Sequence, residues 1–185
     1  MPIEAAEWQD ACRLGPRPGF TPQISVLVGM MHYARLTTRE AVEGLSVQEL
    51  DALPPGFSNS IGMLLAHMAA TDRLYQAASF EGRSCFEADD YAPYVGAMTF
   101  GWKGEPVRGR TLDDLLAELD ATRAETLRQL AEHDDDWLTT LLTAPGFDDM
   151  NQHWAWFHVM EDELSHRGQI RILRKALALQ TPPVS

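Results

Sequence analysis

Four stretches of this 185-residue chain place apolar residues at three- and four-residue intervals, which is the spacing of an amphipathic helix. No stretch alternates apolar and polar residues convincingly, as a half-buried strand would. The four stretches cover residues 22–42, about 58–80, about 111–134 and about 148–177. We therefore predict an all-α fold, an antiparallel four-helix bundle in which the last helix is the longest.

Residues that favour helix starts precede these stretches. Pro22 suits the first turn of a helix, with Thr21 as a cap before it. The serine- and asparagine-rich segment that ends at Ser60 provides N-cap residues for the second helix. Thr111 is followed three residues later by Asp114, which resembles a capping box. Asp148 and Asp149 mark the start expected for the fourth helix.

The connection between the second and third helices, Glu81 to Arg110, is unusually long and contains seven glycine and proline residues. Long connections in compact domains are commonly lids or crossovers. Four aromatic residues lie in it, so we predict a short helix near Asp89–Met98 and a crossover that partly covers one end of the bundle: Tyr91, Tyr94, Phe100 and Trp102. A poorly ordered linker is the alternative. We predict a bundle domain over residues 21–185 and an N-terminal extension over residues 1–20.

The chain carries 27 acidic and 15 basic residues, for a formal net charge of −12. Such a field repels polyanions, so we expect no nucleic-acid partner and no anionic membrane surface as a partner. No apolar run approaches the ~20 residues of a membrane span, and the acidic N-terminus is unlike a signal peptide. We expect a cytoplasmic protein in which Cys12 and Cys85 are reduced.

Metal-competent side chains occupy one face of the fourth predicted helix, where a buried bundle helix would have apolar residues. His158, Asp162 and His166 follow one another at four-residue intervals. A buried carboxylate is costly unless it is paired or coordinates an ion. Residues eight apart rise about 12 Å along a helix, so the two histidines cannot share one ion. Asp162 pairs either with His158 or with His166.

A third ligand has to come from another helix. His67 is the only histidine within the apolar body of the second helix. Taken alone, a histidine in such a position is more often a hydrogen-bonded core residue than a ligand. His32 in the first helix is a weaker candidate, and His133 and His153 lie at helix ends, where we expect them to be exposed.

Other metal and nucleophile schemes lack their sequence patterns. A di-iron bundle needs two Glu-x-x-His pairs, and only Glu163 and His166 form one here. The His-Glu-x-x-His, Gly-x-Ser-x-Gly and phosphate-loop patterns do not occur. Two histidines and one carboxylate leave coordination positions open, as in catalytic zinc and non-haem iron sites. We expect a divalent ion among zinc, nickel, iron and manganese, and favour zinc.

From about Thr21 onward the chain resembles the DinB-like superfamily of damage-inducible, YfiT-type four-helix bundles. The order and spacing of the predicted helices agree with that family. The stretches that carry the resemblance are Glu43-Gly44-Leu45-Ser46, Asn59-Ser60-Ile61-Gly62, Leu65-Ala66-His67-Met68, and the segment from His158 to Ile170 that ends His166-Arg167-Gly168-Gln169-Ile170.

The resemblance implies one metal ligand from the second helix and two from the fourth. Carried over to this chain, these are His67, Asp162 and His166. The middle position is commonly histidine and in some members glutamate, so the shorter Asp162 departs from the pattern. His158 then becomes a neighbour that orients Asp162 from outside the coordination sphere.

The resemblance also implies a function, since the superfamily includes thiol-dependent S-transferases and isomerases. We expect a metal-dependent S-transferase that joins a low-molecular-weight thiol (bacillithiol, mycothiol or glutathione) to an electrophilic small molecule. Arg167 or Arg110 would bind anionic groups of the cosubstrate. A metal-dependent hydrolase and a non-catalytic bundle that binds a small ligand or partner helix are the alternatives. The resemblance is also compatible with a homodimer.

Overall fold

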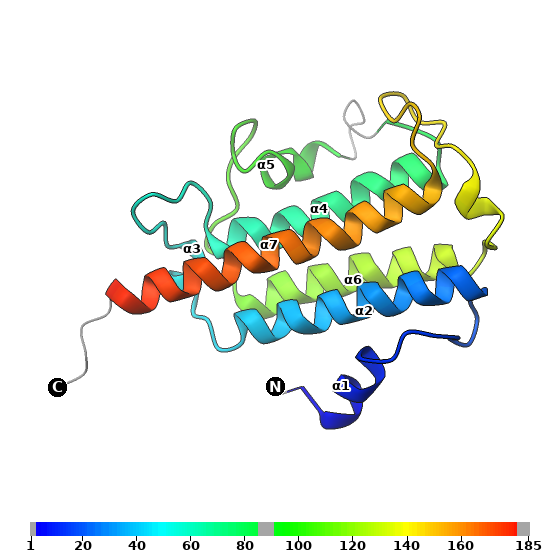
Figure 1. Ribbon diagram of the computed structural model, residues 1–185. Helices are drawn as coiled ribbons and strands as arrows, with labels where there is room; N and C mark the ends of the chain where they lie inside the picture. Colours follow the sequence, from blue (N-terminus) through cyan, green and yellow to red (C-terminus); the bar gives the residue numbers. More distant parts are fainter. Residues whose placement is uncertain (1–2, 85–90, 181–185) are drawn as a thin grey trace.

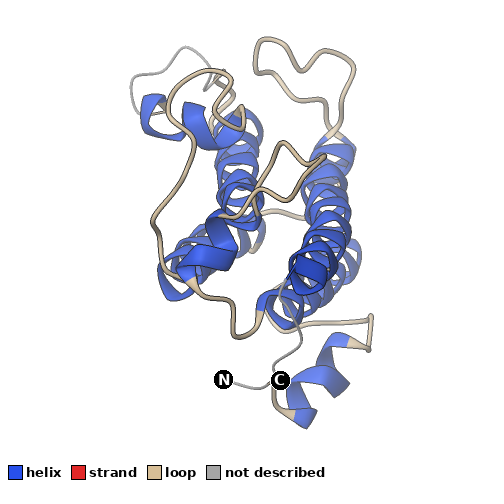
Figure 2. Ribbon diagram, turned by 90° about the vertical axis from the view of Figure 1, so that its left-hand side faces the viewer, coloured by secondary structure: helices blue, strands red, loops and turns tan. Residues whose placement is uncertain are grey.

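The computed structural model describes residues 3–84 and 91–180, and over these residues it contains seven α-helices and no strand (Figures 1 and 2). The prediction of an all-α chain is confirmed. The α-helices are α1 (Ala5–Ala11), α2 (Pro22–Val42), α3 (Val47–Asp51), α4 (Ile61–Phe80), α5 (Val95–Met98), α6 (Leu112–Leu130) and α7 (Gln152–Gln180). Two 3₁₀ turns, η2 (Ala92–Tyr94) and η3 (Trp137–Thr139), complete the described elements.

The four long helices pack against one another. Helix α4 contacts α6 and α7, while α2 contacts α7 and, less extensively, α6 (Figure 1). Their apolar faces bury two clusters of residues, one around Trp156 and one around Leu65. Helix α1, which was not predicted from the sequence, packs against α2. None of the described helices combines the length and hydropathy that a membrane-spanning segment needs.

Side chains cap the helices largely as their residue types predict. The Ser60 hydroxyl accepts a hydrogen bond from the first turn of α4, and Thr111 and Asp114 form a complete capping box at α6. Thr21 makes no such bond at α2. The carboxylate of Asp135 accepts the N–H groups of that first turn instead, at 3.0 Å from the Gln23 nitrogen. A cap that comes from more than 100 residues away is invisible in the local sequence.

The predicted start of the last helix, at Asp148–Asp149, was too early. Asp149 has a φ of +64°, which is outside the helical region, and α7 begins at Gln152. The Asn151 side-chain oxygen accepts the Trp154 N–H at 2.8 Å and acts as the N-cap. The third long helix likewise ends earlier than predicted, at Leu130.

The connection between α4 and α6 contains the short helical segment that the sequence predicts near Asp89–Met98. Its helical part is η2 followed by α5, while Asp89 and Asp90 lie outside the described residues. Gly96 allows the following loop to pack directly on α5. A Cβ atom at this position would lie 2.0 Å from the Glu105 carbonyl oxygen, so no larger residue fits without moving the backbone.

Four buried charged residues, one from each long helix, form a continuous ion-pair network between the helices. Arg35 of α2 donates to both carboxylate oxygens of Glu163 of α7, at 2.9 and 3.3 Å. Arg123 of α6 donates to the same carboxylate at 3.0 Å and to Asp72 of α4 at 2.8 Å. The exposed fractions are 7% for each arginine and 1% for each acid. We call these residues the four-helix network.

The network is balanced, with two positive and two negative charges. Desolvation opposes the charged form of Arg123, but Asp72 and Glu163 raise its pKa above the ordinary value. Thr126 also donates to Asp72, at 2.6 Å. Buried charges are tolerated only where such partners are in place, so each residue of the network depends on helices far from it in the sequence.

We predict that Asp72→Asn destabilises the protein by about 3 kcal/mol or more, because it leaves Arg123 buried with one counter-charge fewer. Urea unfolding followed by circular dichroism measures the change. Glu125→Gln is the matched control, since it removes a carboxylate that pairs with Arg128 at the surface, and it should leave the midpoint nearly unchanged. Equal effects of the two substitutions would contradict the role of the network.

Candidate metal centre

Helices α4 and α7 bring together three of the residues that the sequence singles out. The Nε2 atoms of His67 and His166 lie 3.7 and 3.2 Å from Oδ1 of Asp162. The two imidazole rings are 4.8 Å apart between centroids and nearly perpendicular. Residues from the first half of α4 and the central part of α7 therefore converge on one small volume.

The spacing of these atoms suits a metal ion. One ligand atom from each of the three residues lies within 4.8 Å of the other two. Ligand atoms around a tetrahedral ion with bonds of ~2.1 Å are roughly 3.4 Å apart, close to the two distances to Asp162. The separation between His67 and Asp162 is also too long for a good hydrogen bond. These three residues could hold a metal ion.

The centre is largely shielded from solvent and carries a negative charge. Side-chain exposure is 9% for His67, 15% for Asp162 and 12% for His166. Burial alone would raise the pKa of Asp162, but the imidazoles of His166 and His67 hold that pKa well below its ordinary value. Oδ2 of Asp162 and Nδ1 of His166 are buried and have no hydrogen-bond partner among the described residues. An ion would satisfy a carboxylate in this position.

The connection between α4 and α6 covers the centre and orients His67. The Nδ1 atom of His67 lies 3.3 Å from the carbonyl oxygen of Ala97, so Nδ1 carries the proton and Nε2 is left as the ligand atom. The ring of Phe100 stacks on His67 at 4.2 Å and meets His166 edge-on at 5.7 Å. Phe100 has a φ of +52°, an uncommon conformation for a bulky residue.

The structure does not bring His158 to Asp162, as the proposed orienting role would require. The Nδ1 atom of His158 lies 3.3 Å from the Glu161 carboxylate, and its ring stacks on Trp154 at 5.0 Å. Of the two pairings that the four-residue spacing allows, the structure selects Asp162 with His166. His67 accounts for this pairing, because it lies on the face of α4 that packs against Asp162 and His166.

The two arginines predicted to bind the cosubstrate are engaged elsewhere. Arg110 pairs with the carboxylate of Glu118 and donates to the backbone of α6. Arg167 donates to the Thr37 hydroxyl of α2, while its Nε atom is buried and lacks a partner among the described residues. Among the described residues, no hydrogen bond or ion pair joins either arginine to the side chains of His67, Asp162 or His166.

The remaining histidines lie apart from the centre. His32 faces α1, with Nε2 3.7 Å from the Asp10 carboxylate. His153 is exposed, as predicted. His133 is only half-exposed because its ring stacks on Trp137 at 3.9 Å, and burial lowers its pKa. The prediction of an exposed residue was wrong for His133.

The sequence does not predict the role of the Ala97 carbonyl or the four-helix network. A backbone carbonyl leaves no signal in the side-chain pattern. Phe100 is one of the aromatic residues of the predicted covering connection, but nothing in the sequence places its ring on His67 in particular. The network residues are spread over four helices and resemble ordinary surface charges.

An all-α chain with two imidazoles and one carboxylate around a largely buried point supplies three ligands, one fewer than a closed four-coordinate site needs, and so defines a candidate metalloenzyme of the open-site class. The family model for mycothiol-S-transferase matches residues 26–178, and the chain belongs to this family of thiol S-transferases. The family is part of the DinB-like superfamily, so the resemblance seen in the sequence is confirmed. A comparison with curated proteins finds no match.

We predict that chelator-treated protein binds one equivalent of Zn²⁺ or Co²⁺ and that His67→Ala weakens this binding about 100-fold or more, since even residues outside the coordination sphere contribute 10–100-fold. Calorimetry with Zn²⁺ and the visible spectrum of the Co²⁺ form measure the effect. His153→Ala removes an exposed histidine of α7 and should bind metal as the unmodified chain does. Unchanged affinity in His67→Ala would exclude this centre.

Proposed function

We propose that the chain performs its thiol transfer at the centre formed by His67, Asp162 and His166, with mycothiol as the thiol and an electrophilic small molecule as the acceptor. The observation that carries the proposal is the convergence of these three side chains within 4.8 Å. Membership of the mycothiol-S-transferase family supplies the reaction class.

The charge of the centre suits an anionic fourth ligand. Two neutral imidazoles and the Asp162 carboxylate supply a single negative charge, so a divalent ion among them keeps a net charge of +1. When bound, the ion favours the thiolate form of a coordinated thiol, which is the nucleophilic form. The Ala97 carbonyl fixes the tautomer of His67. The pKa of Asp162 is lowered, so its carboxylate is ionised at neutral pH.

The transfer step forms one bond and breaks one. The thiolate sulfur attacks the electrophilic carbon of the acceptor, the leaving group departs with its electron pair, and the thiol proton passes to solvent. Phe100 shields the two imidazoles from water on one side.

Zinc is the ion that we favour for this centre. It takes nitrogen and carboxylate oxygen ligands at 2.0–2.2 Å and readily adopts a tetrahedral arrangement with one exchangeable position. It also has no redox chemistry of its own, and thiol transfer to an electrophile needs none. Nickel, iron and manganese share these ligand types, so elemental analysis of untagged protein distinguishes them.

We also propose that the four long helices form an antiparallel bundle with two helices in each direction, α4 and α6 against α2 and α7, and with a crossover between α4 and α6. The packing of α4 on α6 and α7, and of α2 on α7, supports this topology. The ribbon colours in Figure 1 support it too, because α4 and α6 follow the same direction and α2 and α7 the opposite one. Two helices with the same direction need a connection that returns along the bundle.

We predict that metal-loaded protein accelerates the reaction of mycothiol with 1-chloro-2,4-dinitrobenzene, and that His166→Ala reduces kcat/KM about 100-fold or more. Absorbance of the dinitrophenyl thioether measures the rate. The same assay with glutathione and bacillithiol tests the choice of thiol. His153→Ala is the matched control and should keep full activity.

Two outcomes would contradict the proposal. Full activity in His166→Ala, at equal folded content by circular dichroism, would place the transfer elsewhere on the chain. Hydrolysis of a p-nitrophenyl ester without added thiol, together with no thioether formation, would indicate a hydrolase in place of a transferase.

A further inference from the structure

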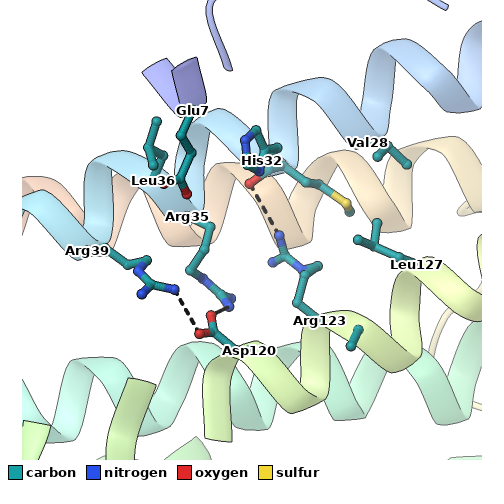
Figure 3. Close-up of a pocket in the computed structure, with 11 residues that line it drawn as sticks. Glu7, Val28, His32, Arg35, Leu36, Arg39, Asp120, Arg123 and Leu127 are labelled. Carbon is teal, nitrogen blue, oxygen red and sulfur yellow. Dashed lines mark hydrogen bonds and ion pairs between the residues drawn. The ribbon is translucent and has the colours of Figure 1, made fainter. Parts of the chain in front are cut away.

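A cavity of about 220 Å³ lies between α2 and α6, and none of the metal-centre residues of α4 and α7 lines it (Figure 3). Its walls differ in character. Five apolar residues form part of the lining: Val28, Met31, Leu36, Ala124 and Leu127. The rest is polar and includes three guanidinium groups, those of Arg35, Arg39 and Arg123.

We propose that this cavity binds a small molecule with an apolar body and one carboxylate group. Nothing in the proposed transfer reaction uses it. A cavity of ~150 Å³ with an apolar lining can hold a benzene ring, so the volume here suffices for a ring or short chain that carries a carboxylate. A mixed lining of apolar wall and few polar groups is typical of small-molecule sites.

The buried arginines retain donors for such a ligand. A guanidinium has five N–H donors. Arg35 uses three of them in its contacts with Glu163 and Asp120. Arg123 uses three in its contacts with Asp72, Glu163 and the Met31 carbonyl, the last of which is drawn in Figure 3. Each buried guanidinium therefore has two N–H groups that these contacts leave unused.

The attraction for an anion comes from these unused N–H donors and not from an excess of local charge, because Asp72, Glu163 and Asp120 balance the three arginines. Three arginines converge on this cavity in a chain whose net charge is −12. Asp120, an acid in the lining, is already paired with Arg35 at 3.3 Å and Arg39 at 2.9 Å. The carboxylates of Asp72 and Glu163 belong to the network and do not line the cavity.

Helix α1 supplies the remaining acid. Glu7 reaches the cavity from α1, and in Figure 3 it lies beside Leu36 and above Arg35. No ion pair within 4.0 Å involves Glu7 among the described residues. Its charge has the same sign as the proposed ligand, so it weakens binding and sets a selectivity for ligands that carry only one carboxylate.

Calorimetric titration of the full chain at pH 7 with sodium benzoate tests the proposal. We expect saturable binding with 1:1 stoichiometry, and binding at least tenfold weaker for the neutral analogue benzamide. The side-chain Nε–H signals of Arg35 and Arg123 in ¹H–¹⁵N spectra should shift on titration with benzoate. Lack of saturable binding, or equal binding of benzamide, would overturn the proposal.

Four substitutions test whether benzoate binds in this cavity. Arg39→Gln, at a position 41% exposed and outside the buried network, should weaken benzoate binding severalfold, while Glu7→Gln should strengthen it. Arg128→Gln removes an exposed arginine of the same helix as Arg123 and should change nothing. Ala124→Leu fills the cavity without a change of charge and should abolish binding. Benzoate affinity that is equal in all four variants would mean that it binds elsewhere.

Discussion

The four-helix network is the constraint on which the rest of the structure depends. Each long helix contributes one buried charge, and a charge in the interior is stable only when its counter-charges are in place. Arg35, Asp72, Arg123 and Glu163 therefore determine which face of each helix points inward. Successive residues on a helix are about 100° apart. Glu163 points to α2 and α6, because it pairs with Arg35 and Arg123. Its neighbour Asp162 is turned by that step toward α4, where His67 lies.

Much of the fold could be predicted from local patterns. The three- and four-residue spacing of apolar residues is enough to find the four long helices, and Ser60 and Thr111 mark two of their starts. The network could not be predicted. Its ion pairs join residues 40 to 128 positions apart, and an arginine in a helix is normally a surface residue. The prediction that Thr21 caps α2 failed for the same reason, since Asp135, which accepts the N–H groups instead, is remote in the sequence.

The candidate site, too, could be predicted only in part from the sequence. Spacing alone left Asp162 with two histidine partners, and the family resemblance selected His166. In the structure the ring of His166 lies 4.8 Å from that of His67, while His158 lies against Glu161. The predicted role of Arg110 or Arg167 in binding the cosubstrate required a guanidinium group without other partners. Sequence patterns cannot show competing partners, and here Glu118 and Thr37 engage these side chains.

The covering segment and the metal centre depend on each other. A positive φ at Phe100 costs about 1–2 kcal/mol for a residue of this size, so the segment does not hold this conformation by its own preference. The ring contacts with His67 and His166 and the close packing of Gly96 on Glu105 offset the cost. The two imidazoles thus act both as candidate ligands and as the surface on which Phe100 rests. A change that displaces either imidazole removes the support of Phe100 and exposes the centre to water.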